Sequence, residues 1–415
     1  MSDLKEMGIL AKRAGVSLRI SSTQQKNDAL LQIKKALFDC TADIIAANQL
    51  DLKSAKENGM PSAMVDRLLL DDARIASMAD GIDTLISLPD PVGGADEMVR
   101  RPNGLLIGKK RVPLGVIGII YESRPNVTVD AAALCLKSSN AVILRGGKEA
   151  LHTNTTLCAI MQDALSLTGL PRECVQIIPT TDRETANEMM RLNGYIDVLI
   201  PRGGAGLIRT VVENATVPVI ETGVGNCHIF VDSCADFDMA TSILYNAKTS
   251  RPSVCNAAEN LLVCEDIAAA FLPLAYQKLS EKNVEFRGCA KTCAILSQAV
   301  PATEEDYFAE FIDYILSVKV VKDIDEAIAH IAKYSTGHSE AIITKSYAHS
   351  QKFLDQVDSA AVYVNASTRF TDGFEMGLGA EIGISTQKMH ARGPMGLKEL
   401  TTTKYIIFGD GQIRE

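Results

Sequence analysis

Apolar positions in the first part of the chain follow the period of an α-helix. Over the first 85 residues apolar side chains recur at three- and four-residue spacing, which predicts amphipathic helices. Ser22 and Gln25 stand at the spacing of a capping box. Residues 88–94, with two prolines and two glycines, close this helical region. The apolar positions that show the period best are Ala29, Leu30, Ile33, Leu37 and Phe38.

From Val112 the pattern changes to short β-prone runs that alternate with segments of helical length. Five strands with four helices between them predict a parallel, doubly wound sheet, an α/β fold. Thr181 and Glu184 have the spacing of a second capping box. The predicted strands are Val116–Ile120, Ala141–Leu144, Val175–Ile178, Val198–Ile200 and Val217–Ile220. Predicted helices include Val129–Ser138, Thr153–Leu167 and Arg183–Leu192.

A second α/β region follows, with predicted strands at His228–Val231, Leu261–Val263 and Ala341–Thr344. The last 25 residues are β-prone, and Leu400–Phe408 has too little chain around it to build a sheet of its own. An apolar terminal strand of this kind pairs within the monomer or with a second subunit.

Composition and charge narrow the class of protein. A chain of 415 residues with 47% hydrophobic content can bury two or three cores. The net charge of -9 is spread without long runs of one sign, which argues against a nucleic-acid partner. Charged residues interrupt the N-terminus, and no apolar run approaches the roughly 20 residues of a membrane span. We therefore expect a cytoplasmic protein with no membrane partner.

The ten cysteines show no CxxC spacing and fall mostly in apolar or mixed segments. They are interpreted as reduced thiols, without a disulfide framework or a metal site.

Three loops that leave the carboxyl ends of predicted strands combine small residues with cations. Each leads into a helix, whose free backbone N–H groups favour an anion. Glycines also simply turn the chain, but three such loops together indicate a nucleotide site at the strand ends. The loops are Arg145-Gly146-Gly147-Lys148, Pro179-Thr180-Thr181 and Pro201-Arg202-Gly203-Gly204.

Cys255 has unusual surroundings among the cysteines, because Lys248 and Arg251 precede it in a segment just before a predicted strand. A reactive thiolate needs positive potential and access. The alternative is that Cys255 is a small core residue. This interpretation applies more strongly to Cys135, Cys158 and Cys264, which lie within apolar periodic segments.

Two further polar segments are candidates for catalysis. Asn126 follows the end of a buried-looking strand, where its amide can donate to an oxyanion or cap the next helix. Glu221 ends an apolar strand beside glycines, as a general base or as a plain surface residue.

In this order the residues resemble the aldehyde dehydrogenase superfamily, and most closely its branch that reduces glutamyl phosphate. An Asn follows the Pro of a strand-to-loop turn, then come a basic residue with glycines, a Glu-x-Gly strand end and the Cys. The long segments that carry the closer resemblance are 111–126, 143–148, 368–373 and 383–396.

The resemblance implies an aldehyde-dehydrogenase-like fold of two doubly wound domains and a β-arm that joins subunits into a homo-oligomer, with the active site between the domains. A nucleotide-binding domain is expected at 1–100 and 121–226, and a catalytic domain at 227–365. The arm is expected at 101–120 and 390–415, and a return segment that lines the active site at 366–389.

The implied activity is the NADPH-dependent reduction of L-glutamyl 5-phosphate to L-glutamate 5-semialdehyde, with release of phosphate, in proline biosynthesis. Cys255 is the implied nucleophile, Asn126 the oxyanion donor and Glu221 the match to the general base, in a reaction that does not need one. The implied substrate-binding residues are Ser123, Arg124 and Arg251 for the phosphate, and Ser367, Thr368 and Arg369 for the amino-acid end.

Lys148 stands where hydrolytic members of the superfamily carry the carboxylate that binds the adenosine ribose. A cation there favours a 2′-phosphate, and so NADP over NAD. A glutamate 5-kinase is an expected transient partner. Two other readings stay open: a dehydrogenase that oxidises a semialdehyde through water activated by Glu221, and a catalytically silent scaffold.

Overall fold

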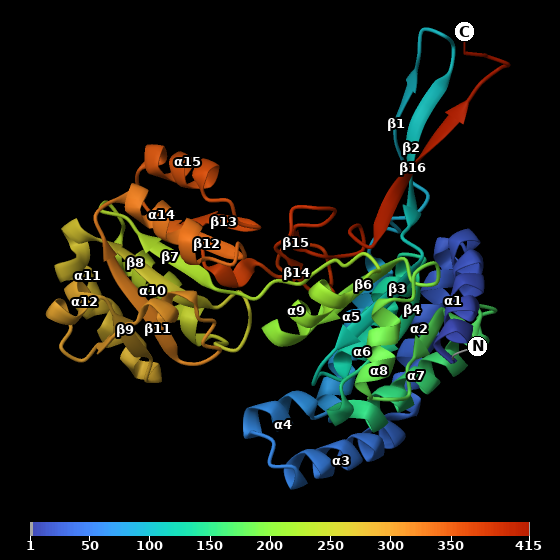
Figure 1. Ribbon diagram of the computed structural model, residues 1–415, viewed down its shortest axis with the longest axis horizontal. Helices are drawn as coiled ribbons and strands as arrows, with labels where there is room; N and C mark the ends of the chain where they lie inside the picture. The colour runs from blue at the N-terminus through green and yellow to red at the C-terminus, as the bar shows by residue number, and fades with distance from the viewer. Residues whose placement is uncertain (1–2, 415) are drawn as a thin grey trace. The chain divides into compact units, whose positions relative to one another are not determined.

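The computed structural model describes residues 3–414, which divide into two compact units (Figure 1). The first unit contains the described residues up to Thr222, Gly377–Gly383 and the described residues from Met395 onward. The second unit contains Gly223–Met376 and Ile384–Pro394. The chain therefore leaves the first unit, builds the second, and returns.

The first unit begins with helices, as the apolar period predicted. Ser22 caps the second of them by accepting a hydrogen bond from the Gln25 backbone N–H at 3.1 Å. The buried stripe of that helix matches the predicted positions except Phe38, which is half exposed because it lies outside the stripe. The helices are α1 (Asp3–Ile20), α2 (Thr23–Asp39), α3 (Thr41–Glu57), α4 (Ser62–Leu68) and α5 (Asp72–Ser87).

A four-stranded parallel sheet follows, in the order β5-β4-β3-β6. Each connection is a helix, so the fold class is confirmed for this unit. The strands are β3 (Val116–Tyr121), β4 (Ala141–Arg145), β5 (Val175–Ile177) and β6 (Val198–Arg202). The helices are α6 (Asn126–Lys137), α7 (Leu151–Ser166), α8 (Arg183–Met190) and α9 (Ala205–Asn214), with the short 3-10 turns η1 (Lys148–Ala150) and η2 (Arg172–Cys174).

Two local predictions in this unit are wrong. The segment Val217–Ile220 makes only an isolated bridge, between Val219 and Leu199, because few of its backbone groups reach β6. Helix α8 is capped by Asp182, whose carboxylate accepts from the Thr185 backbone N–H at 2.7 Å. The expected capping box started one residue too early, at Thr181.

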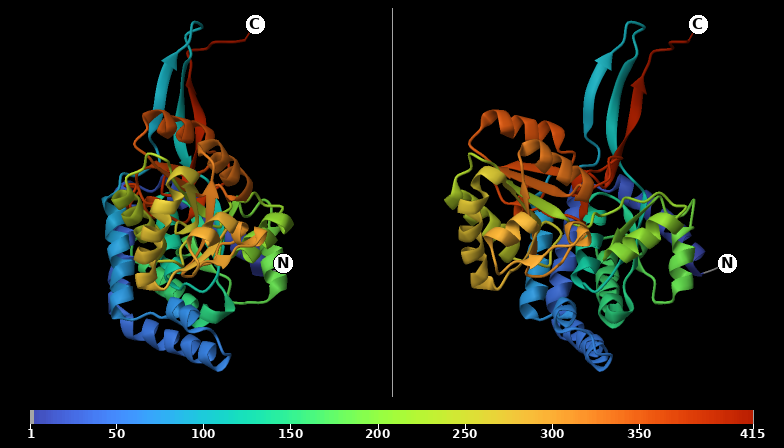
Figure 2. Two further views of the ribbon diagram at one scale, coloured as in Figure 1. Left: turned by 90° about the vertical axis from the view of Figure 1, so that its left-hand side faces the viewer. Right: turned by 60° about the vertical axis from the view of Figure 1, so that its left-hand side comes forward.

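The terminal strand pairs within the chain. Strands β1 (Ala95–Arg100), β2 (Leu106–Pro113) and β16 (Thr401–Phe408) form an antiparallel sheet in the order β1-β2-β16. These strands extend away from the four-stranded sheet as a narrow ribbon (Figures 1 and 2), and most of β1 and β16 is exposed. The first two strands of the ribbon span Ala95–Pro113, whereas the first part of the arm was expected at 101–120. The expected range omitted β1 and included most of β3.

The second unit is built on a seven-stranded parallel sheet in the order β10-β9-β11-β8-β7-β12-β13. Apolar clusters pack on the two faces of its central strands, because strands buried on both sides carry continuous apolar runs. The strands are β7 (Cys227–Val231), β8 (Ala258–Cys264), β9 (Glu285–Gly288), β10 (Val300–Pro301), β11 (Ile315–Val321), β12 (Ser339–Ile343) and β13 (Ala361–Val364).

Helices connect these strands, and a short hairpin completes the second unit. The helices are α10 (Phe237–Thr249), α11 (Glu265–Leu279), α12 (Ala290–Ile295), α13 (Glu304–Phe308), α14 (Ile324–Tyr334) and α15 (Tyr347–Gln356), with the turns η3 (Ser280–Lys282) and η4 (Thr368–Phe370). The hairpin pairs β14 (Ile384–Ser385) with β15 (Gly393–Pro394). Among the described residues, no helix is both long enough and apolar enough to span a bilayer.

Candidate active site

The carboxyl ends of β3 and β6 flank the point at which the strand order of the four-stranded sheet reverses. In doubly wound sheets this point is where ligands bind. A carboxylate already spans it, because Glu122 Oε2 accepts from the Gly204 backbone N–H at 3.0 Å, at the start of α9. A side chain at Gly203 would collide with the same carboxylate. The start of α9 therefore binds an anionic oxygen, as a phosphate cradle must.

A second carboxylate ties the loop after β4 to the loop after β3. Glu149 Oε1 accepts from the backbone N–H of Ser123 at 2.6 Å and from its hydroxyl at 2.8 Å. Ser123 has a φ of 48°, in the left-handed region that a non-glycine residue adopts only where its surroundings hold it. The hydroxyl expected to meet the substrate phosphate thus lies beside a carboxylate.

Arg145 ends β4 and reaches the loop after β5. Its Nη2 donates to the carbonyl oxygens of Thr181 at 2.9 Å and Asp182 at 3.3 Å. Lys148, the first residue of η1, is exposed. The three loops that the sequence singled out are therefore joined at one edge of the sheet, with an exposed cation among them. These residues fit a nucleotide with phosphate groups.

Asn126 is the first residue of α6 and does not cap it. Its Nδ2 donates to Asp130 Oδ2, one turn along the helix, at 2.8 Å. Desolvation raises the pKa of Asp130 to about 6, against the lowering effects of this hydrogen bond and of the Arg202 guanidinium. The capping alternative for Asn126 is wrong, and the amide is held by a carboxylate instead.

Cys255 lies in the loop between α10 and β8 and is partly exposed, unlike Cys135, Cys158 and Cys264, which are buried. This distribution disfavours the alternative that Cys255 is a core residue. The segment before β7 packs on the loop: a side chain at Gly225 would collide with the Cys255 carbonyl, and Cys227 Sγ lies 3.2 Å from the same oxygen. Only a glycine at 225 allows this approach.

The residue after the nucleophile candidate anchors the loop to η4. Asn256 Nδ2 donates to the Thr371 carbonyl at 2.9 Å, and the Asn256 carbonyl accepts from Thr368 Oγ1 at 2.7 Å. Arg369 donates to the Asn256 side chain, and its Nε donates to Ser250 Oγ at 3.1 Å. Residues 367–371 thus hold the shape of the Cys255 loop.

Arg369 also brings positive charge to the loop. Desolvation, together with the nearby charge of Arg251, lowers the pKa of Arg369, while Asp372 and Cys255 act on it in the opposite sense. Arg251 is exposed and Arg369 partly buried. Arg251 and Cys255 thus both lie close enough to Arg369 to act on its charge. Ser367 is buried, and its hydroxyl accepts from the Arg369 backbone N–H at 3.3 Å.

Lys248 does not supply the positive potential that its place in the sequence suggested. Its ammonium is fully buried and lies 2.6 Å from Glu259 Oε2, which is equally buried. Burial raises the pKa of Glu259 and lowers that of Lys248, and the attraction between the two opposes both shifts. The ion pair lies at the end of α10 and on β8, on either side of the Cys255 loop, so its role is to fix both ends of that loop.

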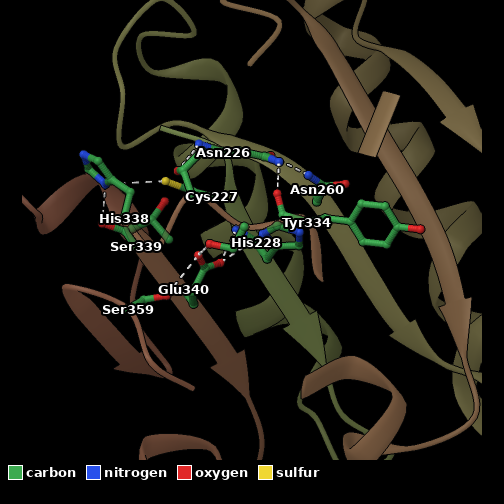
Figure 3. Close-up of polar contacts among 12 residues, drawn as sticks. Asn226, Cys227, His228, Asn260, Tyr334, His338, Ser339, Glu340 and Ser359 are labelled. Carbon is green, nitrogen blue, oxygen red and sulfur yellow. Dashed lines mark hydrogen bonds and ion pairs between the residues drawn. The ribbon is translucent and has the colours of Figure 1, made fainter. Parts of the chain in front are cut away.

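A row of buried polar residues crosses the seven-stranded sheet near the amino ends of its strands. Glu340, His228, Asn260 and Ser317 are in register on β12, β7, β8 and β11. Figure 3 shows the part of this row around Asn226.

Some of these polar groups have hydrogen-bond partners, whereas neither ring nitrogen of His228 makes a hydrogen bond within residues 3–414. His228 Nδ1 lies 3.1 Å from Glu340 Oε2, and Asn260 Nδ2 donates to Asn226 Oδ1 at 2.6 Å. Asn226 Nδ2 in turn donates to the carbonyls of Tyr307 at 2.7 Å and Tyr334 at 2.9 Å. This row fixes the start of β7, and with it Gly225 against the Cys255 loop.

Comparison with known proteins places this geometry in a family. Residues 11–292 match the aldehyde dehydrogenase family. Over the full length of both chains, the sequence is 61% identical to a gamma-glutamyl phosphate reductase of Carboxydothermus hydrogenoformans, and over 98% of each chain it is 62% identical to one of Clostridium perfringens. The chain belongs to the aldehyde dehydrogenase family, in its gamma-glutamyl phosphate reductase branch.

Solved structures agree with this assignment. The crystal structure of gamma-glutamyl phosphate reductase from Thermotoga maritima covers all of both chains with a TM-score of 0.98 at 51% identity. An acetylating aldehyde dehydrogenase from Geobacillus thermoglucosidasius, 16% identical, shares the fold with a TM-score of 0.72. Aldehyde dehydrogenases are oxidoreductases, so the family assignment implies a nicotinamide cofactor.

Sequence reasoning missed the residues that hold the candidates in place. Asp130 follows Asn126 by four residues, the spacing that brings two side chains together on a helix, and this signal was readable. The bonds from Glu122 to Gly204, from Glu149 to Ser123 and from Asn256 to η4 join residues far apart in the sequence. No local pattern announces them.

Proposed function

We propose that this protein reduces L-glutamyl 5-phosphate to L-glutamate 5-semialdehyde with NADPH and releases phosphate, the second step of proline biosynthesis. The observation that carries the proposal is the partly exposed Cys255, held in a braced loop beside Arg251 and Arg369. The names of the full-length relatives supply the substrate.

The chemistry follows from the Cys255 thiolate. Its sulfur attacks the acyl carbon of the mixed anhydride, and the collapse of the tetrahedral intermediate expels phosphate and leaves a thioester. Asn126 and the Cys255 backbone N–H donate to the oxyanion at each tetrahedral stage. A nicotinamide cofactor held by the loops of Arg145–Lys148 and Pro201–Gly204 would supply the hydride that reduces the thioester carbonyl. Loss of the Cys255 thiolate then releases the aldehyde, and the enzyme is ready for another cycle.

The residues proposed to bind substrate divide into two kinds. Arg124, Arg251 and Arg369 carry charge that suits a phosphate or a carboxylate. Ser123, Ser367 and Thr368 have their hydroxyls bonded to neighbouring protein groups, so in this proposal they orient the loops that meet the substrate. The reduction of an acyl phosphate does not require a general base. We therefore propose no catalytic role for Glu221.

For the cofactor we propose NADP, with its phosphates on the loops of Arg145–Lys148 and Pro201–Gly204. Lys148 is exposed and is the cation proposed to meet the 2′-phosphate, while Glu149 is turned inward to Ser123. The Lys148→Glu variant is expected to lose affinity for NADPH at least tenfold, since a carboxylate repels the 2′-phosphate. Affinity for NADH is expected to change little. Fluorescence titration with both nucleotides measures the difference, and equal losses for both contradict the assignment.

The proposal extends to assembly and location. The exposed ribbon of β1, β2 and β16 carries Met98, Val99, Tyr405, Ile407 and Phe408 at its surface, a composition suited to a second copy of the chain. We propose a cytoplasmic homo-oligomer joined by this ribbon, with the upstream glutamate 5-kinase as a transient partner.

The deciding experiment runs the reaction in reverse, as NADP-linked oxidation of glutamate 5-semialdehyde with and without inorganic phosphate. We expect activity only with phosphate. Cys255→Ser is expected to lose several orders of magnitude, and Cys234→Ser, at an exposed cysteine elsewhere in the second unit, to keep full activity. Oxidation without phosphate would identify a hydrolytic dehydrogenase. If the wild-type protein, with Cys255 intact, oxidises the semialdehyde under neither condition, the result would identify a scaffold.

A further inference from the structure

Asp130 supplies the carboxylate that holds the Asn126 amide. The role inferred for it below rests on the proposed function. Both residues belong to α6 in the first unit, on the side of the sheet where strand β3 ends. The hydrogen bond from Asn126 Nδ2 to Asp130 Oδ2 is 2.8 Å long. Asp130 lies outside the segments that carry the resemblance to the family.

An asparagine amide presents either its NH₂ group or its oxygen to a given point, and the two orientations differ by a half-turn of the side chain. An oxyanion donor works only in one of them. An ionised carboxylate accepts hydrogen bonds and donates none, so it binds the NH₂ group and excludes the oxygen. One hydrogen of Nδ2 then faces Asp130, and the second stays available for another acceptor.

We propose that Asp130 is a positioning residue, which fixes the amide of Asn126 so that Nδ2 rather than Oδ1 faces the reacting acyl oxygen. Asp130 itself touches neither substrate nor cofactor in this assignment. Its partly buried place on α6 and its i, i+4 spacing to Asn126 keep the two groups together without help from another element.

The orientation depends on the charge of Asp130. Desolvation raises its pKa to about 6, whereas Asn126 on the same helix and Arg202 at the end of β6 stabilise the ionised form. Above this pH the carboxylate accepts from Nδ2. Below it the protonated carboxyl donates its O–H, binds Oδ1 equally well, and lets the amide turn. Activity is therefore expected to fall as the pH drops through about 6, a limb that belongs to Asp130.

The test compares Asp130→Asn, Asn126→Ala and the double variant in the phosphate-dependent assay. Asp130→Asn is expected to lower kcat by about 10- to 100-fold, to leave the KM for NADP near the wild-type value and to abolish the acid limb near pH 6. The double variant is expected to be no slower than Asn126→Ala, since Asp130 acts only through Asn126. Losses that multiply in the double variant would overturn the inference, as would an acid limb that survives in Asp130→Asn.

A measurement without turnover separates this inference from the proposed reaction. The side-chain NH₂ signals of Asn126, assigned by their loss in Asn126→Ala, are expected to titrate near pH 6 in wild-type protein labelled with ¹⁵N. An amide that does not respond to pH rejects the inference whatever the enzyme reduces. An amide that titrates in a protein without phosphate-dependent activity shows that Asp130 orients Asn126 and rejects the proposed function, so the two failures are distinguishable.

Discussion

The two parallel sheets carry their candidate residues at opposite ends. In the four-stranded sheet these residues follow strands: Asn126 comes after β3, Lys148 after β4 and Gly204 after β6. In the seven-stranded sheet Cys255 comes just before β8 and Gly225 just before β7, and Thr368, which follows β13, bonds back to the Cys255 loop. The rule that ligands gather at carboxyl ends thus describes the first unit and not the second.

The interiors differ in the same way. The strands of the four-stranded sheet are almost wholly apolar inside, whereas buried His228, Asn260 and Glu340 cross the seven-stranded sheet near its amino ends. Amino ends of parallel strands offer no exposed helix starts to bind an anion. The second unit shapes its site with buried polar side chains instead. Burying such groups costs free energy of folding, so substitutions at them test the comparison.

The largest expected effect on stability is at two buried lysines that form ion pairs, Lys26 in the first unit and Lys248 in the second. Lys248→Met leaves Glu259 buried without its cation and is expected to cost about 3–5 kcal/mol. Lys26→Met in the first unit leaves Asp90 with donors from Thr23 and Val92, so about 1–3 kcal/mol is expected. Urea denaturation of both variants measures the difference.

A control for this prediction is the double variant Lys248→Met with Glu259→Leu. It removes both charges and is expected to recover much of the lost stability. If the double variant is as unstable as Lys248→Met, loss of packing rather than an orphaned charge explains the effect.

A smaller effect is expected from the polar row. Asn260→Leu leaves Asn226 Oδ1 without its donor at 2.6 Å and is expected to cost about 1–3 kcal/mol. Ile143→Val, in the apolar interior of β4, is expected to cost about 0.5–1.5 kcal/mol. The Asn260 variant is also expected to make Cys255 react with iodoacetamide at a changed rate, because the row fixes the start of β7. An unchanged labelling rate would confine the row to stability.

The smallest effect is at the cap of α8. Asp182→Ala is expected to lower the melting temperature by about 2 °C, and Thr181→Ala, at the residue that the sequence favoured, to leave it unchanged. Hydrogen bonds from Thr185 lower the pKa of Asp182 to about 2. The folded pKa lies below the unfolded one, so the stabilisation is present above about pH 4 and lost as the pH falls toward 2. Melting curves at pH 2.5 and 7 check this.

The sequence predicted the fold where local periods decide it. Continuous apolar runs in β3, in β4 and at Leu261–Val263 of β8, and the helical stripe of α2, were enough, because burial of those faces dominates their energetics. The strand predicted at Val217–Ile220 does not form, because most of the segment has no neighbouring strand to pair with. The sequence of an apolar run does not show whether such a neighbour exists. The sequence predicted Thr181 rather than Asp182 as the cap of α8, because both residue types cap helices well and the two positions are adjacent.

For the candidate site, the sequence singled out the residues that we propose to do chemistry and not those that hold them. Cys255 and Asn126 lie in long segments of recognisable order, but Lys248 looked like a cation for the thiolate and is buried against Glu259. Whether a charge is free or paired depends on its partner in space. That partner lies eleven residues away, on a different element.

The chain order has a consequence for biosynthesis. Strand β2 is synthesised long before its neighbour β16. At 5–20 residues per second, the wait between Pro113 and Thr401 is on the order of tens of seconds. During that interval the nascent polypeptide presents an unpaired β2 edge, which is open to pairing with other chains until β16 covers it.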